Sequence, residues 1–113
     1  MTVPLAERTC TACRKDAPRL DAAAARALAA EVPGWSFRDN GTWIERNWRF
    51  ADFASAFAFV CRVADIAEAA GHHPDLAFGW GYVRISLQTH AIGGLHETDF
   101  ILAARIDEIA PPL

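Results

Sequence analysis

The stretch Glu68–Asp99 reads EAAGHHPDLAFGWGYVRISLQTHAIGGLHETD, and the order of its elements decides the fold. It begins as the end of an amphipathic helix, turns at the GHHP sequence, continues as a β-strand to His90, turns again at a glycine pair and opens a second helix near Asp99. The four histidines of the chain all lie in this stretch: His72, His73, His90 and His96. An unperturbed imidazole titrates near pH ~6.5, so histidines from separate elements that converge on one ligand could transfer protons. The stretch predicts a proton-transfer site.

The first helix of this stretch starts upstream, where Asp52 is placed to cap it. Apolar residues then recur at helical spacing as far as Gly71, a residue type that readily adopts the left-handed conformation of a helix C-terminus. Pro74 restricts His73 to an extended backbone. We therefore expect the paired histidines in a stiff turn directly after the helix.

The strand predicted over Tyr82–His90 alternates apolar and polar residues and places His90 on its polar face. After the glycine pair, the helix Phe100–Ile109 has His96 at its expected N-cap and Asp99 at position N3. A carboxylate at N3 meets unpaired backbone N–H groups and the positive end of the helix dipole. Asp99 therefore has a structural role available as well as a functional one.

Upstream of this stretch, the pattern predicts a helix over Leu20–Val32 and then a β-hairpin. The hairpin strands are Trp35–Arg38 and Thr42–Phe50, joined by Asn40-Gly41, a strong turn signal. Asp75–Gly79 is too short and mixed to identify as a strand from its pattern alone.

These elements predict an α+β fold with a single domain, in which a four-stranded antiparallel sheet has three helices packed on one face. We assign residues 1–19 to an N-terminal arm and residues 20–113 to the domain. A chain of 113 residues with 52% hydrophobic content suits one domain of this kind.

The composition also limits the classes of function. A formal charge of −3 and a pI of about 5.7 disfavour a nucleic-acid surface, which needs a clustered basic face. The sequence shows neither a signal peptide nor an apolar run of the roughly 20 residues that a membrane span needs. Three cysteines do not suggest a disulfide framework. We expect a cytoplasmic protein without a nucleic-acid or membrane partner.

The arm contains Cys10-Thr11-Ala12-Cys13, the spacing of half a zinc site or of a redox pair. No second CxxC and no HxxxH follows, and a redox pair is expected between a strand and a helix rather than in a polar arm. The motif favours a structural or incidental role, and a zinc module that combines Cys10, Cys13 and two histidines remains an alternative.

Several unlike residues recur at the spacings of a known motif and identify a resemblance to the pterin-4a-carbinolamine dehydratases. The matching positions are Glu68, Gly71-His72-His73-Pro74-Asp75, Trp80, Val83, Thr89-His90, Gly94-Leu95 and Asp99. The CxxC arm is similar to that of bacterial members of the family, and nearly the whole chain is covered. His96 departs from the motif, since many members have Ser or Thr there.

The resemblance implies a hydro-lyase that dehydrates 4a-hydroxytetrahydropterin, the carbinolamine left by aromatic amino acid hydroxylases, to quinonoid dihydropterin. The pterin is then the substrate, and no cofactor and no metal are needed. A functional link to an aromatic amino acid hydroxylase follows, and members of the family are homodimers or homotetramers. Animal members also bind a transcription factor, so a protein-interaction module is a second alternative.

The resemblance also implies roles for residues by position. His72, His73 and His90 correspond to a catalytic trio that protonates the leaving hydroxyl and accepts the N5 proton, although it does not say which is acid and which is base. Asp99 is a pocket carboxylate that binds the pterin or orients His90, while Glu68 and Trp80 support and line the pocket. The preferred pterin side chain and the oligomer size stay open.

Overall fold

The computed structural model describes residues 4–8 and 19–111. The sheet is built from strands β1 (Ser36–Arg38), β2 (Trp43–Arg49), β3 (Asp75–Gly79) and β4 (Tyr82–Leu87). The helices are α1 (Ala22–Ala29), α2 (Phe53–Ala70) and α3 (Glu97–Ile109), with short 3₁₀ turns η1 (Leu5–Glu7) and η2 (His90–Ile92).

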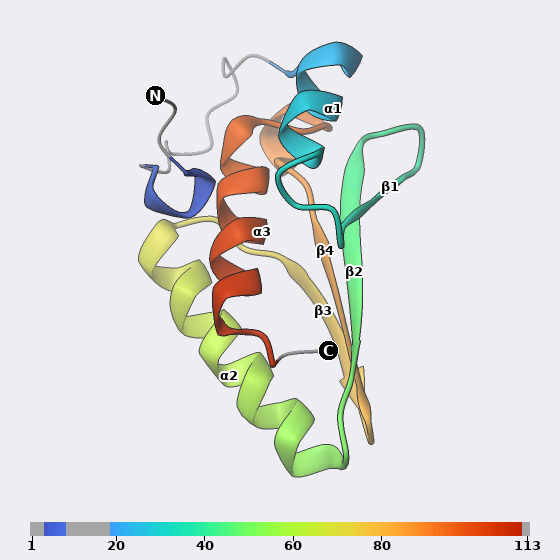
Figure 1. Ribbon diagram of the computed structural model, residues 1–113, viewed down its shortest axis with the longest axis vertical. Helices are drawn as coiled ribbons and strands as arrows, with labels where there is room; N and C mark the ends of the chain where they lie inside the picture. Colours follow the sequence, from blue (N-terminus) through green and yellow to red (C-terminus); the bar gives the residue numbers. More distant parts are fainter. Residues whose placement is uncertain (1–3, 9–18, 112–113) are drawn as a thin grey trace.

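The four strands form one antiparallel sheet in the order β1-β2-β4-β3. The three helices lie together on one side of this sheet, and its other face is left uncovered by helices (Figure 1). The predicted α+β class and four-stranded sheet are confirmed, including the strand β3 that the sequence pattern alone did not define.

The core lies between the sheet and the helices, and it follows from the alternation along β2 and β4. Trp48 pairs with Val83 across these strands, and both side chains are buried. The helices contribute the apolar stripes that cover them, including Phe59 of α2 and Phe100 of α3. In the part of the chain that the structure describes, none of the helices combines the length and hydrophobicity needed to cross a membrane.

Both ends of α2 have the caps expected from the sequence. At its start, the Ser55 backbone N–H donates to the Asp52 carboxylate at 2.8 Å, and this hydrogen bond lowers the pKa of Asp52 below its usual range. At its end, Gly71 has φ 66°, while the backbone N–H of His72 donates to Ala67 O. This is the Schellman arrangement, and it sets the direction in which the chain carries the two histidines.

A polar clamp joins the sheet to α3. The Asp107 carboxylate accepts hydrogen bonds from Trp35 Nε1 at 3.0 Å and from Arg46 Nη1 at 2.9 Å. Burial raises the pKa of Asp107, and these two hydrogen bonds together with the charge of Arg46 oppose that rise. The clamp fixes the last turns of α3 and leaves its first turn to be positioned by other contacts.

The structure corrects one predicted element. Strand β4 ends at Leu87, so His90 does not continue the strand and instead begins the turn η2. The physical reason is local: the Thr89 backbone N–H donates to Gly94 O at 2.9 Å, and this bridge closes a loop that turns the chain away from the sheet. The polar-face position predicted for His90 from strand periodicity therefore does not apply, although its side chain is exposed.

The described start of the N-terminal arm packs on the domain. Leu5 is buried in the core, and the Arg105 side chain of α3 donates hydrogen bonds to the carbonyl oxygens of Ala6 and Arg8. The Cys10 and Cys13 motif lies outside the described residues.

Candidate active site

A buried ion-pair geometry joins the end of α2 to the start of α3. His72 Nε2 lies 2.6 Å from Asp99 Oδ1, and the two side chains are 3% and 0% exposed. A hydrogen bond to a carboxylate in such surroundings is stronger than one in water. The pair therefore holds the turn after α2 against the first turn of α3.

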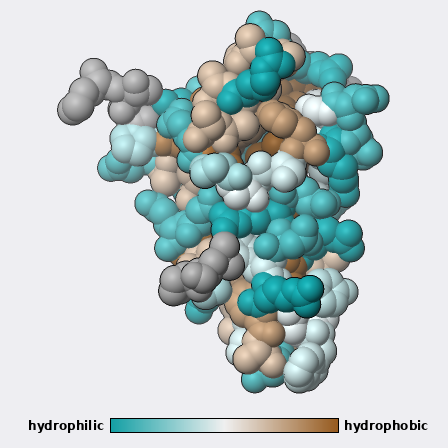
Figure 2. Space-filling model, turned by 45° about the vertical axis from the view of Figure 1, so that its right-hand side comes forward, coloured by the Kyte–Doolittle hydropathy of each residue, from teal (hydrophilic) through white to brown (hydrophobic). Residues whose placement is uncertain are grey.

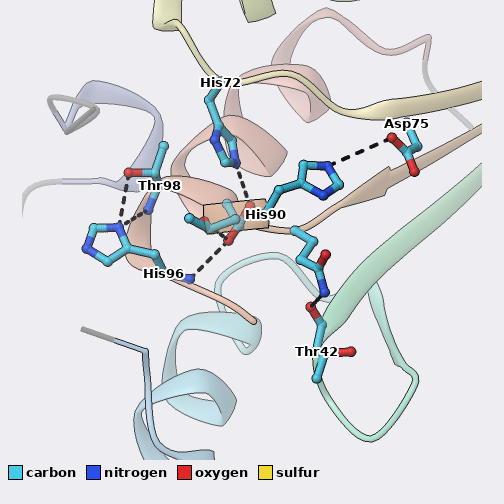
Figure 3. A network of polar contacts seen from close by, with 9 residues as sticks. Thr42, His72, Asp75, His90, His96 and Thr98 are labelled. Atoms are coloured by element: carbon cyan, nitrogen blue, oxygen red, sulfur yellow. Dashed lines mark hydrogen bonds and ion pairs between the residues drawn. The ribbon is translucent and has the colours of Figure 1, made fainter. Parts of the chain in front are cut away.

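Asp99 accepts two further hydrogen bonds through its second oxygen. Thr89 Oγ1 donates at 2.7 Å and the His96 backbone N–H donates at 3.0 Å. The predicted N-cap is confirmed as well, because the Thr98 backbone N–H donates to His96 Nδ1 at 3.3 Å (Figure 3). Asp99 thus connects α3, the turn after α2 and the residue before His90.

His73 points to solvent, in contrast to its neighbour. Its Nε2 lies 2.5 Å from Glu68 Oε1, in the last turn of α2, and the two side chains are 62% and 76% exposed. A carboxylate at this distance orients the ring. Adjacent residues in an extended chain point to opposite sides, which explains why one histidine of the pair is buried and the other is accessible.

His90 is the second accessible histidine. Its Nε2 lies 4.0 Å from Asp75 Oδ1, with both side chains about as exposed as His73 (Figure 3). The Trp43 ring packs edge to face against the imidazole, with 5.5 Å between the ring centroids. Asp75 and His73 are two residues apart in an extended segment and therefore project to the same side of the chain. We infer that His73 and His90 flank Asp75.

The uncovered face of the sheet provides space next to Asp75. A shallow pocket of about 280 Å³ is lined there by Arg38, Asp75, Leu76, Ala77, Arg84 and Ser86. Glu45 borders the same surface, accepting hydrogen bonds from Arg38 Nη1 at 2.9 Å and from Ser86 Oγ at 3.0 Å. A flat polar ligand that enters this pocket meets Asp75, whose Oδ1 lies 4.0 Å from His90 Nε2.

The structure brings together most of the residues predicted for the site. Asp99 contacts His72 and not His90, and it is linked to His90 through the neighbouring Thr89. Glu68 supports His73 directly. Trp80 is not brought close: it is 74% exposed at the turn between β3 and β4, at the opposite end of β3 from the histidines.

Three residues of the site were not identified from the sequence. Asp75 had a usable signal, because it follows Pro74 at the start of an extended segment and shares a direction with His73. Thr89 is a position of the motif without an assigned role and Trp43 had no signal, since their contacts with Asp99 and His90 depend on tertiary packing.

The expectation of a metal-free reaction stays a prediction. Among residues 4–8 and 19–111, no three His, Cys, Asp or Glu side chains are grouped as metal ligands. The zinc alternative depends on Cys10 and Cys13 and stays a prediction.

Known proteins resemble this chain over nearly its full length. Residues 18–109 match the family described as Pterin 4 alpha carbinolamine dehydratase. A protein of Aromatoleum aromaticum, provisionally named as a pterin-4-alpha-carbinolamine dehydratase, is 47% identical over 111 residues that cover 98% of this chain and 99% of the relative.

Two solved structures share the fold. The crystal structure of a transcriptional coactivator/pterin dehydratase from Brucella melitensis matches with a TM-score of 0.78 and 31% identity, and the match covers 83% of this chain and all of that one (100%). A pterin dehydratase-like protein identified as a RuBisCO assembly factor in the alpha-carboxysome matches with a TM-score of 0.58 and 29% identity, over 66% of this chain and 87% of that one.

Proposed function

Because the chain belongs to the pterin 4 alpha carbinolamine dehydratase family, we propose that it converts 4a-hydroxytetrahydropterin to quinonoid dihydropterin and water. The observation that carries this proposal is the pair of accessible imidazoles, His73 with the Glu68 carboxylate beside it and His90 with the Asp75 carboxylate beside it. Such a pair supplies an acid and a base that both work near neutral pH.

The reaction needs two proton transfers. The N5 lone pair forms the C4a=N5 bond while the C4a–O bond breaks, and the leaving hydroxide is protonated to water. The N5–H proton then passes to a base, so the products are quinonoid dihydropterin and water. Hydroxide is a poor leaving group, so the acid contributes most where the C–O bond breaks. No electrons are transferred to another molecule, and this chain needs no redox cofactor for the step.

His73 and His90 take these two roles. Glu68 Oε1 lies 2.5 Å from His73 Nε2, and Asp75 Oδ1 lies 4.0 Å from His90 Nε2. The closer carboxylate holds the His73 ring more firmly, and we assign the acid to His73 and the base to His90. A pterin ring placed over the pocket beside Asp75 would present its C4a/N5 edge between them.

His72 and Asp99 act by positioning. The His72 imidazole is buried and bonded to Asp99, so it does not meet the substrate in this conformation. Through Thr89 and His96, Asp99 fixes both ends of the loop that carries His90. A fixed loop keeps the base at the distance that proton transfer requires.

The direct test is dehydration of 4a-hydroxytetrahydropterin by the purified protein, followed by the absorbance of the quinonoid product. We expect acceleration over the spontaneous reaction, and an unchanged rate after treatment with a chelator. A dehydration rate equal to that of the spontaneous reaction in buffer alone would overturn the proposed activity. Loss of activity on chelation would instead favour the zinc alternative.

We also propose that the protein works as a homo-oligomer. The outer edge of β3 is unpaired in the described chain, and Phe53, Phe57 and Phe78 gather beside it with ring centroids about 6 Å apart. Antiparallel pairing of β3 with the same strand of a second copy would bring the partner's Trp80 toward Asp75. In such a dimer, Trp80 would line the pocket of the other copy, as predicted for a pocket residue. Light scattering that finds only monomers at micromolar concentration would contradict this.

The solved relatives named as a coactivator and as an assembly factor favour a protein-interaction role as the second candidate. The exposed rings of Phe53 and Phe57 are the surface most suited to it. Partner binding that persists in a His73→Ala/His90→Ala variant and is lost in Phe53→Ala/Phe57→Ala would identify such a role, and it would leave the dehydratase proposal standing.

A further inference from the structure

A recess that is lined by both apolar and basic residues lies away from the histidines. A pocket of about 380 Å³ opens between α1, the β1–β2 hairpin and the segment before α3. Its lining consists of Arg19, Leu20, Ala22, Ala25, Arg26, Phe37, Asn40, Gly41 and Leu95. Figure 2 shows hydrophobic residues around a hollow in the upper part of this face.

The charged residues that line this pocket are all positive. Arg19 and Arg26 both line it, and no carboxylate does. Within residues 4–8 and 19–111, neither guanidinium has a hydrogen-bond or ion-pair partner, whereas Arg38 and Arg46 are each paired with a carboxylate. Two guanidinium groups that line one pocket attract an anion and can bind it with several N–H donors.

The interior of the pocket is apolar and held in place. Ala25 and Leu95 are buried, while Phe37 leaves 40% of its surface exposed as one wall. The Leu20 backbone N–H donates to Leu95 O at 3.0 Å, which ties the approach to α1 to the segment before α3. Arg19 lies over Gly94 so closely that a Cβ there would be 2.4 Å from its Nε. The shape therefore does not depend on a ligand being present.

We propose that this pocket binds a small organic anion with an apolar, preferably aromatic, body, such as an aromatic carboxylate or phosphate monoester. The anionic group meets Arg19 and Arg26, while the body packs on Phe37 and Leu95. None of these residues belongs to the histidine site, so the inference stands independently of the dehydratase proposal.

Four probes separate the contributions of charge and of apolar body. We expect phenyl phosphate and benzoate to bind saturably in calorimetric titrations, with shifts of the amide NMR signals of Arg26, Phe37 and Leu95. Inorganic phosphate, which lacks the body, should bind about tenfold more weakly, in line with the loss of apolar burial. Benzylammonium, which reverses the charge, should not shift these signals. Equal binding of benzylammonium and benzoate would overturn the proposal.

Variants then locate the site. Arg19→Gln and Arg26→Gln should each weaken phenyl phosphate binding about tenfold, as expected for the loss of a charged hydrogen-bond donor. Both side chains are exposed, so these variants should fold, and circular dichroism checks this. Arg62→Gln, an exposed arginine of α2, is the matched control and should leave the affinity unchanged. Wild-type affinity in the Arg19→Gln/Arg26→Gln double variant would overturn the assignment, while normal binding by a His73→Ala/His90→Ala variant would support a separate site.

Discussion

The buried imidazole of His72 lies 2.6 Å from the carboxylate of Asp99, which is 27 positions further along the chain. This contact joins the residue after the α2 cap to the first turn of α3. Because Asp99 also accepts from Thr89, the residue before His90, one buried carboxylate links the elements that carry all the accessible histidines of the site. The neighbouring residues His72 and His73 therefore have different roles.

Stability should separate these two histidines. His72→Ala leaves Asp99 Oδ1 without this buried donor, so we expect the free energy of unfolding to fall by about 1–3 kcal/mol. His73→Ala removes a side chain that is 62% exposed and should change it by less than about 0.5 kcal/mol. Urea unfolding of both variants checks this. Equal stability of the two would mean that the buried pair does not hold the fold together.

The charge and hydrogen-bonding pattern of Asp99 should matter for both folding and rate. In Asp99→Asn, an NH₂ group replaces one of two oxygens that both face donors, so we expect a loss of about 1–3 kcal/mol in unfolding free energy and slower dehydration. Asp65→Asn makes the same chemical change at an exposed position of α2 and serves as control. Wild-type stability and wild-type rate in Asp99→Asn would contradict the positioning role.

Variants of His96 test whether this residue caps helix α3 and takes no part in the reaction. His96→Ala removes the Nδ1 acceptor of the Thr98 backbone N–H and should lower the unfolding free energy by about 1 kcal/mol. His96→Ser offers a hydroxyl acceptor and should restore most of it. The dehydration rate of both should stay within a few-fold of wild type, so a large loss of rate in the serine variant would place the His96 imidazole in the chemistry.

The cap of α2 should show a pH signature. The pKa of Asp52 is lower in the folded state than its ordinary value of 3.8, so its carboxylate stabilises the fold above that pH, and the contribution is lost as pH falls through the folded pKa. Asp52→Ala should therefore melt below wild type at neutral pH, and the gap in melting temperature should narrow below pH 3.8. Asp65→Ala, on the same helix but away from the cap, should show no such narrowing. A gap that is constant with pH would show that the charge is irrelevant to the cap.

Features with a local cause could be predicted from the sequence. The caps at Asp52, Gly71 and His96 depend on residues within a few positions, and the structure contains each of them. The end of β4 could not be predicted because the Thr89–Gly94 bridge interrupts a polar/apolar alternation that continues in the sequence.

The sequence predicted which residues belong to the site, but not how their side chains are placed relative to one another. The motif named His72, His73 and Asp99, but which imidazole is buried follows from the packing of α2 against α3. Trp80 illustrates the opposite case, because a residue in the turn of a hairpin must lie at the far end of its strands from residues that precede the hairpin.

We propose that His73 and His90 transfer the two protons of carbinolamine dehydration, and the dehydration rates of their alanine variants are the decisive measurement. We expect His73→Ala and His90→Ala each to slow the reaction by roughly 10²- to 10⁴-fold while melting near wild type. The double variant should lose less than the product of the single losses, since the two groups serve one reaction. Wild-type rates in both single variants would contradict the account.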